Sequence, residues 1–278
     1  MDSVVQNSID LAAAAIKEAK TLIITAGAGM GVDSGLPDFR GSEGFWRAYP
    51  PYARLGLKFE NLATPRHLEE DPEFGWGFYG HRSIEYRSVV PHKGFSILRQ
   101  WQKELDLHCH VITSNVDGQF QKAGFSEEEV VEIHGTIHHL QCIQPCSLSL
   151  WPNEHEFKID CETMRTKDIP YCPKCDQVAR PNILMFGDFQ WISRRTDRQE
   201  MRFKQCTVCD IKEPTVIIEM GAGKAIPTIR WLGERMLKSR GAKLIRINIR
   251  DPEVPAGQIS IPLGAREALE RINESLSR

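Results

Sequence analysis

Three side chains that could hold a ligand or move a proton follow apolar runs in this sequence. Asn115 and Asp117 come just after the run at 110–113, and His134 follows the run at 130–133. If both runs are strands of a parallel sheet, these side chains gather at its carboxyl edge, where α/β proteins bind ligands. An imidazole titrates near neutral pH and suits general-base catalysis. A lone histidine is more often structural, but the position of this one directly after a strand favours a functional role.

A glycine-rich turn follows the first apolar run, at 21–25, and contains Gly27, Ala28 and Gly29. Glycines let the backbone approach a pyrophosphate, and a helix that begins there would direct its N-terminus at the anion. Val32 stands where a dinucleotide fingerprint has its third glycine, and the usual acidic residue about twenty positions later is missing. The turn alone therefore also fits a tight connection that binds no ligand.

Close pairs of cysteines indicate a metal site. Thiolates at such spacings form tetrahedral zinc sites, and four thiolates leave no open position for catalysis. One arrangement joins the pairs Cys142, Cys146, Cys172 and Cys175. The alternative joins the second of these pairs to Cys206 and Cys209, although the neighbouring apolar run at 215–219 favours core packing for those two. Spacing alone leaves both arrangements open, and this context favours the first.

A tyrosine and an arginine stand three positions apart in a helix expected at 73–89. Tyr79 and Arg82 would share one face of this helix. A phenol and a guanidinium side by side can hold a carboxylate together. The alternative is an exposed pair of the kind that any helix can present by chance.

The elements that position these residues follow from the hydrophobic pattern. Strands are expected at 21–25, 110–113, 130–133, 215–219 and 243–248, and helices at 8–20, 93–105, 226–239 and 264–276. Ser8 is the expected N-cap of the first helix. Strands that alternate with helices predict an α/β chain with a Rossmann-like parallel sheet covered on both faces.

Two segments interrupt this alternation and suggest a second domain. Residues 42–92 carry aromatic side chains and prolines, and residues 138–182 are polar, contain cysteines and are expected to be poor in strands. We expect these two segments to form a smaller domain that combines a helical insertion with a zinc-binding module. The Rossmann-like domain would then comprise residues 1–41, 93–137 and 183–278.

Composition excludes several classes of protein. The chain has 278 residues, with 35 Lys and Arg against 37 Asp and Glu and a net charge of −2. These values exclude a disordered chain and a dedicated polyanion binder, so we expect no direct nucleic-acid binding. No stretch approaches the roughly 18 apolar residues that a bilayer span needs, and the start of the chain does not resemble a signal peptide. We expect a cytoplasmic protein without membrane association.

Several motifs, taken in order, resemble the sirtuin (Sir2) family of NAD-dependent protein deacylases. The glycine turn continues into Ser34-Gly35-Leu36-Pro37-Asp38-Phe39-Arg40-Gly41, followed by Asn115-Val116-Asp117, Ile133-His134-Gly135, two cysteine pairs, Arg180-Pro181, Phe186-Gly187-Asp188, Gly221 and Asn248. The resemblance covers nearly the whole chain. It implies NAD as cofactor, one structural Zn²⁺ ion, and an acyl-lysine protein or peptide as substrate. The implied products are nicotinamide, free lysine and O-acyl-ADP-ribose.

The resemblance also implies roles for individual residues. His134 would be the general base, acting with Asn115 and Asp117. The implied NAD-binding residues are Gly27, Ala28, Gly29, Asp38, Phe39, Arg40, Ser114, Asn115, Asp117, Gly221, Ala222, Gly223 and Asn248. The implied zinc ligands are the cysteines at 142, 146, 172 and 175, which leaves the other four as reduced thiols in or near the core.

The substrate side of the site is implied in the same way. Tyr79 and Arg82 resemble the branch of the family that removes succinyl or malonyl groups from lysine. The peptide would lie across Gly187, Asp188 and the segment 221–227, pairing through its backbone as an added strand.

Departures from the family pattern cluster in the expected NAD site. Gly31 stands where the family usually has serine, Ser114 replaces glutamine, and Gly221-Ala222-Gly223 replaces Gly-Thr-Ser. The lost hydroxyls would weaken NAD binding unless another group compensates, and the charge of Lys224 is a candidate. Two other functions therefore stay open: a sirtuin-like ADP-ribosyltransferase or NAD glycohydrolase, and a non-catalytic NAD-sensing module.

Overall fold

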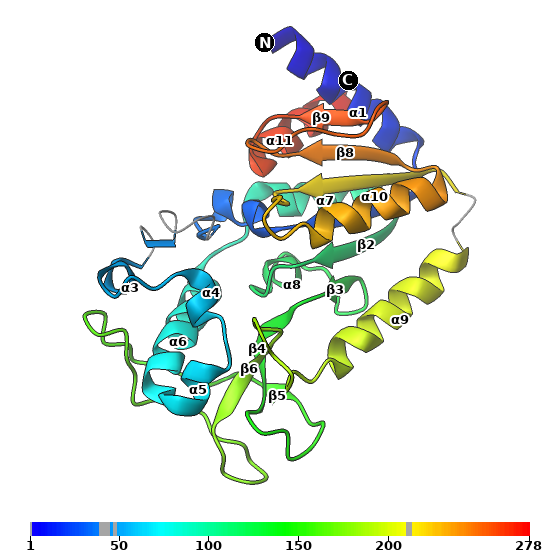
Figure 1. The fold of residues 1–278 in the computed structure, drawn as a ribbon. Coiled ribbons are helices and arrows are strands. Elements are labelled where there is room, and N and C mark those ends of the chain that lie inside the picture. Colours follow the sequence, from blue (N-terminus) through cyan, green and yellow to red (C-terminus); the bar gives the residue numbers. More distant parts are fainter. Residues whose placement is uncertain (1, 39–44, 47–48, 210–212) are drawn as a thin grey trace.

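A six-stranded parallel sheet forms the centre of the protein (Figure 1). The computed structural model describes residues 2–38, 45–46, 49–209 and 213–278. The strands run in the order β3-β2-β1-β7-β8-β9, and every neighbouring pair is parallel. Their bounds are β1 (Thr21–Ala26), β2 (His108–Thr113), β3 (Val130–Glu132), β7 (Thr215–Met220), β8 (Lys243–Ile247) and β9 (Ile259–Ile261). The strand order reverses between β1 and β7, so a crevice opens at their carboxyl ends.

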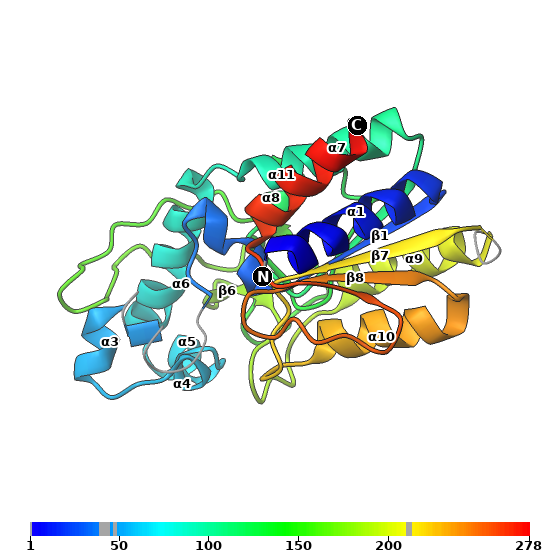
Figure 2. The same cartoon turned by 90° about the horizontal axis from the view of Figure 1, so that it is seen from above.

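Helices cover both faces of this sheet. Figure 2 shows α1 (Asp2–Glu18), α7 (Lys93–Glu104) and α11 (Ala265–Leu276) on one face, with α9 (Arg194–Cys209) and α10 (Thr228–Arg240) on the other. All six residues of β1 are buried. Leu22 and Ile24 pack in the cluster under the first set of helices, whereas Ile23 packs in the cluster under the second. This alternation is the physical reason why the strand is an uninterrupted apolar run.

A second, smaller region lies beside the carboxyl edge of the sheet (Figure 1). It contains α3 (Pro50–Arg54), α4 (Phe59–Leu62), α5 (Arg66–Glu70) and α6 (Pro72–Ser88), together with the antiparallel strands β4 (Gly135–Cys142), β5 (Trp151–Pro152) and β6 (Ala179–Ile183). Its core is rich in aromatic rings, among them Phe45, Tyr52 and Phe78. The division into two domains at the boundaries given above stays a prediction.

Several expectations about the elements are wrong in detail. Ser8 lies inside α1 and is not its N-cap, since the helix already begins at Asp2. The segment 138–182 is not poor in strands, because β4 and β6 pair across it. After β1 the expected α-helix is replaced by two 3₁₀ turns, Ala28–Met30 and Val32–Ser34. In the described part of the chain, no helix is long and apolar enough to cross a membrane.

Candidate active site

A cavity of about 630 Å³ opens where the strand order reverses. Most of the residues singled out from the sequence line it: Gly27, Ala28, Asp38, Tyr79, Arg82, Ser114, Asn115, Asp117, His134, Gly221, Ala222, Gly223 and Lys224. They come from the loops after β1, β2, β3 and β7 and from α6. The rule that ligands bind at the carboxyl edge of a parallel sheet therefore locates this cavity correctly.

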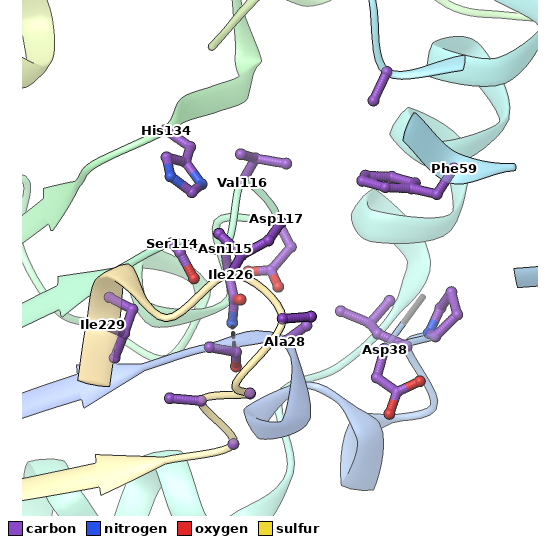
Figure 3. A pocket seen from close by; sticks show the side chains of 18 of the residues that line it. Ala28, Asp38, Phe59, Ser114, Asn115, Val116, Asp117, His134, Ile226 and Ile229 are labelled. Carbon is purple, nitrogen blue, oxygen red and sulfur yellow. Dashed lines mark hydrogen bonds between the residues drawn. The ribbon is translucent and has the colours of Figure 1, made fainter. Parts of the chain in front are cut away.

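Asn115 and His134 are held at the cavity by the ends of β2 and β3. The Asn115 side-chain amide donates to the Gly27 carbonyl at 3.0 Å, which ties the β2 loop to the glycine turn. The Thr113 hydroxyl accepts from the Asn115 backbone N–H and donates to the Ala26 carbonyl. Figure 3 shows Asn115, Asp117 and His134 across the pocket from Asp38 and Phe59.

Burial sets the protonation of the two titratable groups in this part of the site. It lowers the pKa of His134 below its ordinary value, so the ring is neutral and able to accept a proton at pH 7. Burial also raises the pKa of Asp117 to about 6. The backbone N–H of Gln119 and the charge of Arg82 lower this pKa, because both favour the carboxylate, but burial has the larger effect. The Asp117 side chain is held at 2.9 Å by that Gln119 N–H. Asp117 is thus an anion at neutral pH that mild acid would neutralise.

The glycines of the first turn bring two loops together. Gly29 donates its N–H to the Gly221 carbonyl, and Gly27 donates to Met220. A Cβ on Gly29 would lie 2.6 Å from the Gly221 Cα, and Gly221 has a φ of +61°. Neither position tolerates a side chain, because the two backbones touch. The amides of Gly27 and Gly29 are therefore engaged within the protein, and their contact with a cofactor stays a prediction.

The loop after β7 is braced from the next strand. Asn248 is buried, and its side-chain amide donates to the Ala222 carbonyl at 2.8 Å. The carbonyl oxygen of that amide accepts the backbone N–H groups of Arg250 and Asp251. Asn248 does not line the cavity; it positions residues that do.

Lys224 does line the cavity, but its ammonium group has acidic partners. It lies 2.9 Å from a carboxylate oxygen of Glu253 and 3.5 Å from one of Asp251. Arg250, which also lines the cavity, lies 3.6 Å from the Asp38 carboxylate. The compensating role expected of Lys224 stays a prediction, and two carboxylates share its charge.

Tyr79 and Arg82 are buried, and both line the cavity. The exposed-pair alternative is therefore wrong. The Arg82 guanidinium packs against the rings of Phe59 and Phe78, at 5.8 and 5.2 Å from their centroids. The Tyr79 hydroxyl is buried without a hydrogen-bond partner among the described residues. Such an unsatisfied donor on a residue that lines a cavity is suited to a polar ligand.

Sequence reasoning missed Tyr86, which also lines the cavity from α6. Its hydroxyl oxygen accepts from Arg82 Nε at 3.1 Å and from Arg82 Nη2 at 2.6 Å. The available signal was the helical spacing, because residues 79, 82 and 86 share one face of a helix.

Four cysteine thiols converge in the smaller region. The Sγ atoms of Cys142, Cys146, Cys172 and Cys175 all lie within 4.8 Å of one another. The separations 142–175 and 146–172 are both 3.6 Å. Zn–S bonds of about 2.3 Å in a tetrahedron place sulfurs about 3.8 Å apart, so this set fits a structural zinc ion. The alternative pairing with Cys206 and Cys209 is wrong.

The remaining cysteines follow the expectation only in part. Cys109 is buried, as expected of a reduced thiol in the core. Cys161 and Cys206 are exposed, so their placement in or near the core is wrong. The segment carrying Cys206 is the C-terminal end of α9, which turns that side chain to solvent. The side chain of Cys209 lies outside the described part.

The positions expected to contact peptide differ from one another. Gly187 is exposed and has a φ of +65°. The Asp188 carboxylate points inward and pairs with Arg180, and both side chains are 0% exposed. Contact of Asp188 with a peptide would therefore use its backbone. The expected cofactor residues Phe39 and Arg40 lie outside the described residues.

Comparisons with known proteins agree with this architecture. A family model described as the Sir2 family matches residues 27–226. A protein of Thermococcus kodakarensis named NAD-dependent protein deacylase is 29% identical over 262 residues, covering 94% of this chain and 93% of its own. One of Halalkalibacterium halodurans named NAD-dependent protein deacetylase is 31% identical over 233 residues and 84% of both chains. The crystal structure of a Sir2 homolog–NAD complex is 25% identical, with a TM-score of 0.71 over 96% of this chain and 93% of that one.

Proposed function

Because this chain belongs to the Sir2 family, we propose that it is an NAD-dependent protein-lysine deacylase that prefers acyl groups ending in a carboxylate, such as succinyl and malonyl. The relatives named NAD-dependent protein deacylase or deacetylase support the reaction class. The observation that carries the acyl preference is the placement of Tyr79 and Arg82, buried at the cavity that His134 also lines.

The acyl preference follows from charge and shape. Arginine stays protonated even when buried, so the cavity contains a fixed positive charge. An acyl chain that ends in a carboxylate offers the matching anion and oxygens for both the guanidinium and the Tyr79 hydroxyl. Burial raises the pKa of Tyr79 to about 12, so this hydroxyl remains a donor at neutral pH. A short neutral acyl group offers no carboxylate to the guanidinium and would leave the Tyr79 hydroxyl without an acceptor.

The cavity residues divide the work of the reaction. NAD, when bound, supplies the ribose carbon to which the acyl oxygen is transferred as nicotinamide leaves. The neutral His134 ring accepts a proton at its unprotonated nitrogen, as general-base catalysis requires. Asn115, held by Gly27, and Asp117 orient the cofactor at the end of β2. The apolar side chains Val116, Ile183 and Ile229 line the same cavity and exclude water from it.

The substrate partner is proposed to be an acyl-lysine protein or peptide. It would lie beside the exposed residues Gly187 and Phe186 and the segment 221–227, with Ile226 at the cavity. The net charge of −2 argues against nucleic-acid binding, which needs an excess of positive charge. The group of four zinc-binding thiols fits a reducing compartment such as the cytoplasm.

The test compares succinyl-lysine and acetyl-lysine peptides of one sequence, with NAD, in the parent and in Arg82→Met. The ratio of kcat/KM for succinyl over acetyl should fall by roughly 10- to 100-fold, since one hydrogen bond to a charged group is removed. A ratio that stays the same would refute the acyl preference. Product masses test the reaction itself: O-acyl-ADP-ribose supports a deacylase, free ADP-ribose without acyl peptide indicates a glycohydrolase, and NAD binding without turnover indicates a sensor.

A further inference from the structure

One face of α6 presents three polar side chains to the cavity. Tyr79, Arg82 and Tyr86 line it at the spacing i, i+3 and i+7, and all three are buried. Two of them are part of the carboxylate pocket proposed above. The third, Tyr86, accepts hydrogen bonds from Arg82 and keeps its hydroxyl proton available to donate to a ligand.

The Tyr86 hydroxyl oxygen is an acceptor for Arg82. A guanidinium can only donate, so both contacts, at 3.1 Å from Nε and 2.6 Å from Nη2, use lone pairs of the Tyr86 oxygen. The hydroxyl proton must then point elsewhere, and no residue in the described ranges accepts it. Burial raises the pKa of Tyr86, so the phenol keeps this proton at neutral pH.

The same contacts fix the guanidinium plane. Tyr86 holds one edge of Arg82, and the rings of Phe78 and Tyr86 lie 5.2 Å from its central carbon. An arginine held in this way loses little side-chain entropy when it binds a planar anion. The rings also exclude water, which strengthens each hydrogen bond in the pocket.

We propose that Tyr86 is a specificity-determining residue, which orients Arg82 and donates its own hydroxyl proton to the terminal carboxylate of the acyl group. The carboxylate then meets three donors on one helix face: the hydroxyls of Tyr79 and Tyr86 and the guanidinium of Arg82. This inference rests on the proposed preference for acidic acyl groups. It adds Tyr86 to the motif formed by Tyr79 and Arg82.

The test uses Tyr86→Phe, which removes the hydroxyl and keeps the ring beside Arg82. The control is Tyr52→Phe, because Tyr52 is a buried phenol in the same aromatic cluster whose hydroxyl has no hydrogen-bond partner among the described residues and does not line the cavity. The substrates are a succinyl-lysine peptide and the same peptide with the terminal carboxylate converted to an amide. Steady-state kinetics with NAD give kcat and KM for each.

The expected result for Tyr86→Phe is a fall of roughly 10- to 100-fold in the kcat/KM ratio of succinyl over its amide analogue, carried by KM. Tyr52→Phe should keep both the parent ratio and the parent Tm. Tyr86→Phe removes the acceptor of two hydrogen bonds from the buried Arg82 guanidinium, so its Tm should fall, and the amide analogue measured with the same variant corrects for any general loss of activity. If Arg82→Met collapses the ratio but Tyr86→Phe keeps it, the role of Tyr86 is refuted and the carboxylate pocket stands. If Arg82→Met itself keeps the ratio, the pocket is refuted, and the role of Tyr86 with it.

Discussion

The buried pair of Asp188 and Arg180 allows a quantitative test of how the proposed peptide-binding edge is built. Both side chains are 0% exposed. Arg180 Nη1 donates to an Asp188 oxygen at 2.9 Å, and the Gln190 backbone N–H donates to the same carboxylate at 3.0 Å. Asp188→Asn keeps the shape but removes the charge, so it leaves the Arg180 cation buried without its anion. Removing one partner of a buried ion pair costs about 3–5 kcal/mol.

The change in melting temperature follows from the size of the protein. An unfolding entropy of about 2.1 cal/mol/K per residue gives roughly 0.6 kcal/mol/K for 278 residues. A loss of about 4 kcal/mol should therefore lower the Tm by about 7 °C. Scanning calorimetry and urea unfolding of Asp188→Asn measure the two quantities independently.

A double-mutant cycle separates the ion pair from a simple packing defect. Asp188→Asn combined with Arg180→Met should be more stable than the sum of the single effects predicts, because no uncompensated charge remains. Strict additivity, or a loss below about 1 kcal/mol for Asp188→Asn, would refute this account. A carboxylate that instead contacts the peptide would show a raised peptide KM with an unchanged Tm.

Three further predictions concern the rest of the site. If His134 is the general base, as proposed, the fall of kcat/KM on the acid side of the pH profile should be centred below pH 6.5, because burial lowers the pKa of His134 from 6.5 and a base must be neutral to accept a proton. A fall centred above pH 6.5 would contradict that role. The purified protein should contain one zinc ion per chain by elemental analysis, and a strong chelator should lower its Tm; an unchanged Tm after the metal is removed would rule out a structural ion. Gly29→Ala should destabilise the fold by about 1–3 kcal/mol and weaken NAD binding, because its Cβ would meet the Gly221 backbone at 2.6 Å. In Gly31→Ala the new Cβ meets Leu36 side-chain atoms at 3.2 and 3.3 Å and the Ala28 backbone oxygen only at 3.7 Å, so calorimetric titration and urea unfolding should show a smaller effect.

The sequence by itself determined the parts of this protein that depend on local patterns. The strands β1 and β7 are largely apolar runs because both of their faces are buried, and that pattern is visible without a structure. His134 directly follows the strand β3, and the carboxyl ends of parallel strands meet at one edge of the sheet. Its position in the sequence therefore pointed to the cavity. The closely spaced cysteines predicted the four-thiol cluster, although context was needed to choose the correct pairs.

Only the tertiary structure decided which way the polar side chains face. Asn115 bonds to Gly27 across 88 positions of sequence, and the loops of Gly29 and Gly221 touch through their backbones. Helical spacing placed Arg82 on a face of α6, but its burial depends on rings contributed by other segments. Periodicity reports which face of an element is apolar, whereas a cavity, an inward ion pair or an unsatisfied hydroxyl depends on segments that meet only after folding. For this reason the sequence located the site, and the contacts of Tyr86 and Asp188 became visible only in the folded protein.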